Sequence, residues 1–296
     1  MASKEELRTQ IALLVKTIQA CEAPIVVSVD GNIAAGKSTL LDTLESVVGE
    51  EMLEKIPEPV SKLQRLEITQ EDGTAVVYNI LDEFYKNPKR WGYFFQSFKF
   101  FERGQAHHKP MATTRPIRVM ERCAFGDFVF PKTLHTLNLM SDMEWHGYEK
   151  LFVPYVQKLL PRTPHLMIYL YLEAEECLKR LQKRQRAEES GVDLDYLQAL
   201  ESTHEEWMPD DRGVCKKFEI PYVRVHSKAD YESDEHEKLK IVHLILTEIV
   251  KVIPAAVEEH RQEIILHARA LIRGMTSTQK SRVGVSAVTA LETLFE

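Results

Sequence analysis

Residues 25–38 of this chain read Ile25-Val26-Val27-Ser28-Val29-Asp30-Gly31-Asn32-Ile33-Ala34-Ala35-Gly36-Lys37-Ser38. Ile25–Val29 is mostly apolar and β-branched, which predicts a buried strand. Gly31–Ser38 fits the pattern GxxxxGK[ST], and the helix that follows is expected to begin near Ser38 and to end at Gly49. A glycine loop between a buried strand and a helix is typical of an α/β fold.

The chemistry of this loop points to phosphate. Glycine lets the backbone curl so that successive N–H groups point inward, and the helix N-terminus adds positive potential. Lys37 would reach the β- and γ-phosphates of a nucleoside triphosphate, and the hydroxyl of Ser38 would ligate Mg²⁺. A chance match is the alternative, but the strand before and the helix after the loop weigh against it. The pattern does not separate a kinase from an ATPase or a GTPase.

Other apolar runs extend the sheet. Four of them predict further strands, with stretches of mostly helical periodicity between them: Met52–Ile56, Ile117–Met120, Leu166–Leu172 and Tyr222–Val225. We therefore predict a P-loop-type three-layer α/β fold with a central, mainly parallel five-stranded sheet flanked by helices. Ligands of such folds gather at the carboxyl ends of the strands.

The composition changes after Pro254. Residues 1–253 are predicted to form one domain, and residues 254–296 a helical C-terminal extension of unknown role. Within the extension, residues 255–273 have the pattern of an amphipathic helix closed by Gly274.

Composition and charge exclude several classes of protein. The chain has 296 residues and a net charge of −7, which argues against a protein that coats nucleic acid. Its four cysteines form no CxxC pair, so neither a zinc knuckle nor a disulfide framework is expected. The apolar runs are too short to cross a membrane, and no targeting segment is persuasive. A cytoplasmic protein is the expectation, with nuclear and mitochondrial locations left open.

Six motifs, in order, resemble those of the cellular and viral deoxynucleoside kinases, nearest the deoxycytidine/purine branch. The similarity spans roughly residues 24–252. It rests on the loop Gly31–Thr39, Pro57-Glu58-Pro59-Val60, Phe95-Gln96 with Arg103, Glu121-Arg122-Cys123 with Asp127, the run from Arg180 to Glu189, and Asp193–Trp207. The resemblance implies ATP- and Mg²⁺-dependent transfer of a phosphoryl group to the 5′-hydroxyl of a deoxynucleoside. ATP, or another nucleoside triphosphate, would be the donor.

The resemblance assigns catalytic roles to three residues besides Lys37. Glu58 would be the general base, although by itself it also reads as a loop acid between two prolines. Glu121 would help to hold Mg²⁺, and Arg122 would orient the 5′-oxygen and Glu58. A buried Glu–Arg ion pair is the structural alternative, and both can be true together.

A basic run from Lys179 to Arg186 has two interpretations. It can be a solvated helix face balanced by nearby glutamates. The resemblance favours a lid at about residues 180–191, with Arg184 and Arg186 on phosphates and Arg180 against the ATP base. Tyr231, in the loop Ser227–Ser233, would also lie near the ATP base.

The nucleoside would bind against the predicted helix Trp91–His107. The amide of Gln96 can donate and accept at once, which suits a base edge. By resemblance, Arg103 and Asp127 form the ion pair of kinases that accept deoxycytidine and purine deoxynucleosides, so thymidine is expected to be a poorer substrate. Glu189 and Tyr85 would bind the sugar 3′-hydroxyl, and Phe130 would stack on the base.

Two departures affect the pocket. Leu63 stands where the family usually has tryptophan, and a stretch one residue shorter than in relatives could put Pro131 in the place of Phe130. The family's homodimers suggest the helices Trp91–His107 and Ala124–Leu139 as an interface.

Three other functions compete with the leading one. A thymidylate-type monophosphate kinase shares the loop and lid but needs further basic residues, for which Arg65 and Arg90 are the obvious spares. A non-catalytic scaffold relative would be expected to lack Lys37, Glu58 or Arg122. A simple ATPase switch does not explain Glu58 or Gln96.

Overall fold

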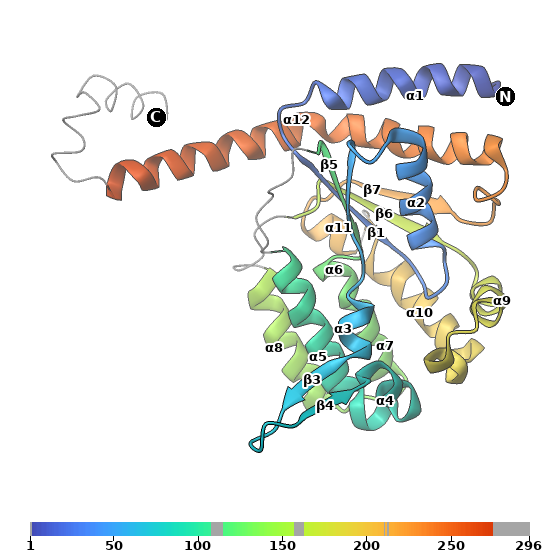
Figure 1. Ribbon diagram of the computed structural model, residues 1–296, viewed down its shortest axis with the longest axis vertical. Coiled ribbons are helices and arrows are strands. Elements are labelled where there is room, and N and C mark those ends of the chain that lie inside the picture. Colours follow the sequence, from blue (N-terminus) through green and yellow to red (C-terminus); the bar gives the residue numbers. More distant parts are fainter. Residues whose placement is uncertain (1, 108–114, 157–162, 210, 212, 275–296) are drawn as a thin grey trace.

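The computed structural model describes residues 2–107, 115–156, 163–209, 211 and 213–274. Its centre is a five-stranded parallel sheet in the order β2-β5-β1-β6-β7 (Figure 1). The strands are β1 (Ile25–Asp30), β2 (Leu53–Ile56), β5 (Ile117–Glu121), β6 (Leu166–Tyr171) and β7 (Tyr222–His226). The predicted fold class and all five predicted strands are confirmed.

Helices cover both faces of the sheet. One face carries α1 (Lys4–Gln19), α2 (Lys37–Val48) and α12 (Glu235–Gly274). The other carries α5 (Pro88–His107), α6 (Ala124–Asp127), α7 (Val129–Thr136), α8 (Asp142–Pro154), α10 (Leu194–Trp207) and α11 (Val214–Lys217). The short helices α3 (Val60–Gln64) and α4 (Ile80–Lys86), with α9 (Ala174–Arg184) and the 3-10 helix η2 (Ala187–Gly191), surround the carboxyl edge of the sheet.

Strand alternation explains the two cores. Val27 of β1, Val119 of β5 and Ile168 of β6 pack on the α1–α2–α12 side. Their neighbours Val26 and Met120 pack on the opposite side. Successive side chains of a strand point to opposite faces, so a strand that is apolar throughout must be covered on both sides.

The sheet order places the catalytic candidates at one edge. β1 lies between β5 and β6, so the chain leaves the carboxyl end of β1 where the strand order reverses. Such a switch point is the usual ligand crevice of an open α/β sheet. The glycine loop (residues 31–38) follows β1, Glu58 comes two residues after β2, and Glu121 is the last residue of β5.

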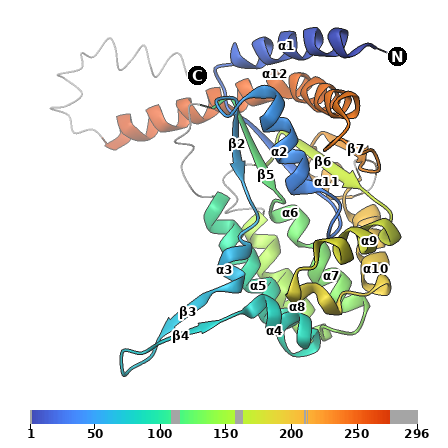
Figure 2. The same ribbon diagram turned by 45° about the vertical axis from the view of Figure 1, so that its right-hand side comes forward.

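An antiparallel hairpin replaces a stretch that we expected to be mostly helical. β3 (Leu66–Thr69) and β4 (Ala75–Tyr78) pair and project from the body (Figure 2). The turn between them contains Asp72-Gly73, with Gly73 at φ 84°, a conformation that glycine adopts without strain. Alternating β-branched residues with Asp-Gly between them are the local signal for this hairpin.

The C-terminal helix does not stop where the composition changes. α12 runs without a break from Glu235 to Gly274, with Pro254 inside it. Beyond that proline, Ala256 is buried in the core, and Glu259 pairs with His165 Nε2 at 2.8 Å. The expected boundary between residues 253 and 254 is therefore not a structural boundary, although the predicted helix over 255–273 is confirmed. Residues 275–296 of the expected extension lie outside the described residues.

The second expected interface helix also differs. Residues 124–139 form two short helices, α6 and α7, and almost all of residues 124–134 are buried. They pack inside the domain against α5 and α10, and the exposed positions of the stretch, Thr136 and Asn138, are polar, so it presents no exposed apolar face. Within the described part of the chain, no helix is both long and apolar enough to span a membrane.

Candidate active site

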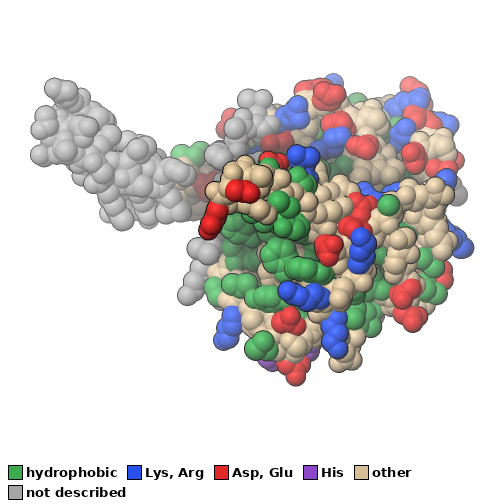
Figure 3. Space-filling view, turned by 60° about the horizontal axis from the view of Figure 1, so that its bottom comes forward, with side chains coloured by type: hydrophobic (Ala, Val, Ile, Leu, Met, Phe, Trp, Pro, Cys, Tyr) green, Lys and Arg blue, Asp and Glu red, His purple; other side chains and the backbone are tan. Residues whose placement is uncertain are grey.

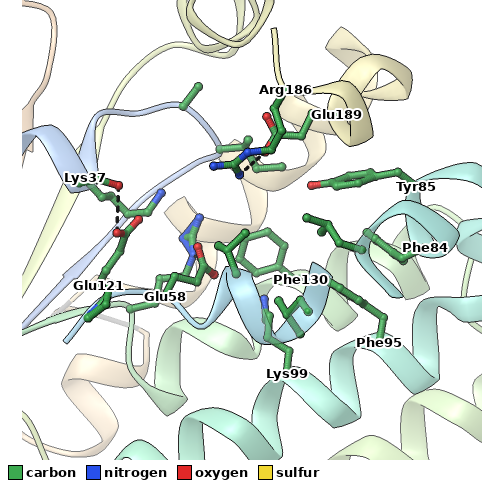
Figure 4. A pocket seen from close by; sticks show the side chains of 18 of the residues that line it. Lys37, Glu58, Phe84, Tyr85, Phe95, Lys99, Glu121, Phe130, Arg186 and Glu189 are labelled. Carbon is green, nitrogen blue, oxygen red and sulfur yellow. Dashed lines mark hydrogen bonds and ion pairs between the residues drawn. The ribbon is translucent and has the colours of Figure 1, made fainter. Parts of the chain in front are cut away.

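Two cavities meet at the glycine loop. The inner cavity has a volume of about 290 Å³ and lies between α3, α4, α5, α7 and the loop (Figure 4). The outer cavity, of about 900 Å³, lies between the loop, α9 and residues 228–233. Both are lined by Ala34, Lys37, Ser38, Glu121, Arg184 and Arg186. A ligand in one cavity can thus come within reach of a ligand in the other beside Lys37 and Ser38.

Backbone geometry explains the glycines of the loop. Gly31 has φ 149° and Gly36 has φ 97°, and a Cβ on Gly31 would collide with the carbonyl of Leu170. Asn32 is held by a 2.9 Å hydrogen bond from Nδ2 to the carbonyl of Leu197 in α10, and Ile33 is buried beside it. Ala34, at φ 59°, and Ala35 complete the curve before α2 begins, and Thr39 lines the outer cavity.

Lys37 folds back over its own loop. Its Nζ donates to the carbonyl of Asn32 at 2.8 Å and lies 3.4 Å from that of Gly31. Burial lowers the pKa of the Lys37 ammonium to about 8, with Arg122 acting in the same direction and nearby carboxylates opposing. These carbonyls hold the ammonium at the junction of the two cavities.

Ser38 and Glu121 lie together at this junction. Ser38 Oγ donates to Glu121 Oε2 at 3.0 Å. Mg²⁺ prefers oxygen ligands and usually takes one or two from the protein, with water and phosphate oxygens completing the shell. This hydroxyl–carboxylate pair fits such a site. No group of three or more His, Cys, Asp or Glu side chains that could hold a metal occurs within the described ranges.

Glu58 lies between two arginines. Its Oε1 is 3.2 Å from Arg103 Nη2 and 3.4 Å from Arg122 Nε. Burial alone would raise the pKa of the Glu58 carboxyl, but Arg122, Arg103, Lys99 and Lys37 together lower it to about 2. The carboxylate is therefore ionised across the physiological range, and it faces the inner cavity.

Arg122 is held in an unusual backbone conformation. It has φ 62°, in the left-handed region that non-glycine residues rarely adopt. Its Nη1 donates to the carbonyl of Gly31 at 2.6 Å and lies 3.4 Å from Asp30 Oδ1. The guanidinium thus joins the end of β5 to the start of the glycine loop. The next residue, Cys123, is fully buried, and burial raises the pKa of its thiol to about 11, so it is not a thiolate at neutral pH.

Sequence reasoning missed the group behind Arg122. Asp30 is the last residue of β1, is fully buried, and has Oδ1 3.6 Å from Nε2 of His204. Burial would raise the pKa of Asp30, but His204 and Arg122 outweigh it and lower the pKa. His204 of α10 thus faces this carboxylate. An acid at the end of a buried strand directly before the loop was the available signal.

The predicted base-binding residues converge on the inner cavity. Gln96 and Phe130 line it, and Arg103 pairs with Asp127 beneath it through Nε and Oδ2. Both amide atoms of Gln96 are buried and lack a hydrogen-bond partner among the described residues. Phe130, not Pro131, is the residue of α7 that lines the cavity, and Leu63 forms part of the wall.

The residues of the predicted lid form an ion-pair cluster. Glu189 in η2 accepts from Arg184 Nη2 and, at 2.9 Å, from Arg186 Nη1. Figure 4 shows Arg186 and Glu189 above the inner cavity, with the Tyr85 ring pointing toward it. Gln185, between the arginines, is in the left-handed region at φ 54° and ends α9. The basic run is thus helical through Arg184, and only Gln185 and Arg186 lie beyond the helix.

Arg180 and Tyr231 support the loop from the outer side. Arg180 Nη2 donates to the carbonyl of Ser227 at 2.7 Å, and its Nη1 lies 3.3 Å from that of Ala35. Tyr231 is almost fully buried and lies with its hydroxyl 3.3 Å from the carbonyl of Gly36. Both residues also line the outer cavity. Ser227, which the sequence analysis did not single out, links the two side chains.

Comparison with known proteins gives one consistent result. Residues 27–251 match the family model described as "Deoxynucleoside kinase". The chain is 32% identical over 222 residues to the mitochondrial deoxyguanosine kinase of Xenopus laevis, covering 70% of this chain and 83% of that one. It is 31% identical over 231 residues to the deoxycytidine kinase of Mus musculus, covering 72% and 87%. It is 28% identical over 217 residues to a probable deoxycytidine kinase of fowlpox virus, covering 73% and 84%.

Proposed function

This chain belongs to the deoxynucleoside kinase family and is an enzyme of that kind, and from this premise we propose its reaction in detail. The γ-phosphoryl group of ATP is transferred to the 5′-hydroxyl of a deoxynucleoside in the presence of Mg²⁺. The observation that carries the proposal is the meeting of the two cavities at Lys37, Ser38 and Glu121, with Glu58 facing the inner one. The nucleoside occupies the inner cavity and the triphosphate the outer one.

Glu58 accepts the proton of the 5′-hydroxyl. The 5′-oxygen forms its bond to the γ-phosphorus while the bond from that phosphorus to the β–γ bridging oxygen breaks, and ADP leaves. A carboxylate whose pKa is about 2 is too weak a base to remove the proton in advance. The proton therefore moves as the new O–P bond forms, as expected for a loose phosphoryl-transfer transition state. Arg122, which contacts Glu58, orients that carboxylate.

Cations neutralise the charge of the transferred group. Lys37 lies at the junction of the cavities, and Arg184 and Arg186 line both of them. In the structure these two arginines bind Glu189, so the lid must exchange part of that pairing for phosphate oxygens when ATP binds. Mg²⁺, held by Ser38 and Glu121, would supply further positive charge at the β- and γ-phosphates.

The inner cavity accommodates the nucleoside. Glu189 and Tyr85, at its mouth, bind the 3′-hydroxyl, and Phe130 stacks on the base. Gln96 reads the base edge, and the Arg103–Asp127 pair supports a preference for deoxycytidine, deoxyadenosine or deoxyguanosine over thymidine. The donor lies against Arg180 and Tyr231 in the outer cavity.

Two copies of the chain form a homodimer through α5 and α8. Phe94 and Phe101 lie seven residues apart on one side of α5, and Met143 and Leu151 are exposed on α8. Figure 3 shows hydrophobic side chains gathered on the face of the molecule that it presents. A face of this kind is unusual on a monomer. Phe101→Glu and Leu151→Glu are expected to give monomers in analytical ultracentrifugation. Leu13→Glu, at an exposed position on α1, is the matched control, and a monomeric unmodified protein would refute the proposal.

Initial rates of phosphorylation test the reaction. Deoxycytidine, deoxyadenosine, deoxyguanosine and thymidine are supplied with ATP and Mg²⁺ to the unmodified protein and to Glu58→Gln. The variant is expected to lose roughly 10²–10⁴-fold in kcat. Glu83→Gln, an exposed glutamate of α4, should keep full activity. Turnover of deoxynucleoside monophosphates alone would contradict the proposal, and thymidine as the best substrate would contradict the base preference.

A further inference from the structure

Lys99 is a buried lysine that lines the inner cavity, and the reaction proposed above gives it no role. Lys99 is in α5, three residues after Gln96 and four before Arg103, so the three share one face of the helix. It is 3% exposed and lines the inner cavity. Figure 4 shows its side chain pointing into the cavity beside Phe130 and toward Glu58.

The contacts of Lys99 place its ammonium over the ring of Phe130, inside the cavity proposed for the base. Nζ lies 3.8 Å from the centroid of the Phe130 ring and 3.3 Å from Asp127 Oδ1. Asp127 Oδ1 has no hydrogen-bond partner among the described residues, so this ion pair is not a hydrogen bond. Burial lowers the pKa of Lys99, while Asp127 and Glu58 oppose that effect. The N–H groups of Lys99 are thus open to an acceptor brought by a ligand.

Gln96 alone cannot distinguish two classes of base. A 6-aminopurine offers an acceptor at N1 and a donor at its amino group, and a 6-oxopurine offers the reverse pair. A glutamine amide can turn over and satisfy either pattern. Because both amide atoms of Gln96 lack partners among the described residues, no contact holds the amide in one orientation. A side chain near Gln96 must therefore discriminate between 6-aminopurines and 6-oxopurines.

We propose that Lys99 makes this pocket selective, among purine nucleosides, for a carbonyl oxygen over an amino group at position 6 of the base, so that deoxyguanosine and deoxyinosine are preferred to deoxyadenosine. The inference rests on the proposed function and narrows its substrate class. An ammonium donates to a carbonyl oxygen but opposes the positive edge of an amino group. Asp127 would otherwise attract an amino group, yet Lys99 and Arg103 both neutralise its charge.

Matched nucleosides isolate the group at position 6 of the purine. Deoxyinosine and deoxyadenosine form one pair, and deoxyguanosine and 2-aminodeoxyadenosine form the second, in which both carry a 2-amino group. For the unmodified protein we expect kcat/KM to favour the oxo member of each pair by about tenfold or more, as is typical when a site is built to bind one polar group. Lys99→Met should lower that ratio at least fivefold, and Lys99→Arg, which keeps the charge, should preserve its direction.

Lys89→Met is the control, since Lys89 is exposed near the start of the same helix. It should leave both ratios unchanged, and thermal unfolding of each variant shows whether the fold is intact. A ratio near or below one in the unmodified protein overturns the inference, as does a large ratio that Lys99→Met leaves intact. If no deoxynucleoside is phosphorylated, the proposed function fails instead. Calorimetric binding of deoxyinosine and deoxyadenosine to the unmodified protein and to Lys99→Met then decides the inference by the same ratios.

Discussion

Ser38 Oγ donates a hydrogen bond to Glu121 Oε2 at 3.0 Å, although 83 residues separate the two in the sequence. The bond joins the first turn of α2 to the last residue of β5. It sets a hydroxyl and a carboxylate side by side where both cavities open. The arrangement follows from parallel pairing, because neighbouring parallel strands bring their carboxyl ends to one edge.

Substitution of Glu121 should alter the response to Mg²⁺. In Glu121→Gln one charged ligand of the proposed ion is lost, so the Mg²⁺ concentration for half-maximal rate should rise about tenfold or more. The measurement is a Mg²⁺ titration of initial rate at fixed ATP. Glu50→Gln, at an exposed position before β2, should match the unmodified protein. An unchanged titration midpoint in Glu121→Gln would exclude Glu121 as a metal ligand.

The pKa of Lys37 predicts an alkaline loss of ATP affinity. Burial lowers this pKa from its ordinary value of 10.5 to about 8 in the free protein. The charged form binds phosphate, so kcat/KM for ATP should be constant below pH 7.5 and fall by about tenfold per pH unit well above pH 8. Glu58, with a pKa of about 2, should add no acid limb above pH 5.

The variant Lys37→Arg tests whether Lys37 is the group that causes the alkaline fall in this pH profile. The guanidinium stays charged, so the alkaline limb should disappear even if the overall rate is low. A limb that persists near pH 8 in this variant would assign it to another group. A profile that stays flat to pH 9.5 in the unmodified protein would show that Lys37 does not titrate in this range.

Gly126 has no room for a side chain. A Cβ at this position of α6 would lie far closer than 3.0 Å to the buried carboxylate of Asp30. Gly126→Ala should therefore displace Asp30, lower the melting temperature by several degrees, and reduce kcat through the Asp30–Arg122 contact. In Gly147→Ala of α8 the nearest atom is an ordinary 3.5 Å away, so stability should be kept or improved. Equal melting temperatures for the two variants would contradict the argument.

The segment after Pro254 should contribute to stability. Ala256 is 2% exposed in the core, and Glu259 pairs with His165, whose Nδ1 accepts a 2.9 Å hydrogen bond from the N–H of Val26 in β1. A chain that ends at Ile253 should therefore melt several degrees below one that ends at Gly274. If the two melt at the same temperature, the continuation of α12 adds nothing to the domain.

Local patterns in the sequence predict much of the fold. The apolar runs predicted five strands, because a parallel strand covered on both faces must be apolar along its length. The glycine loop could also be predicted from the sequence, because its positive φ angles require glycine at residues 31 and 36. By contrast, the hairpin β3–β4 was missed, although Asp72-Gly73 between β-branched residues was its signal. The passage of α12 through Pro254 depends on the packing of Ala256 and Glu259, which local composition does not reveal.

The sequence by itself determined that a phosphate-binding loop follows a buried strand, because that pattern is written in consecutive residues. Only the tertiary structure decided which side chains share the site. In the sequence, Lys99 is one more charged residue on an aromatic helix. The packing of α5 beside α7 brings its ammonium to Phe130 and Asp127. His204 reads as packing until α10 carries it to Asp30. Helical spacing tells which residues share a face, but contacts between distant elements determine what that face meets and how far its charges are removed from water.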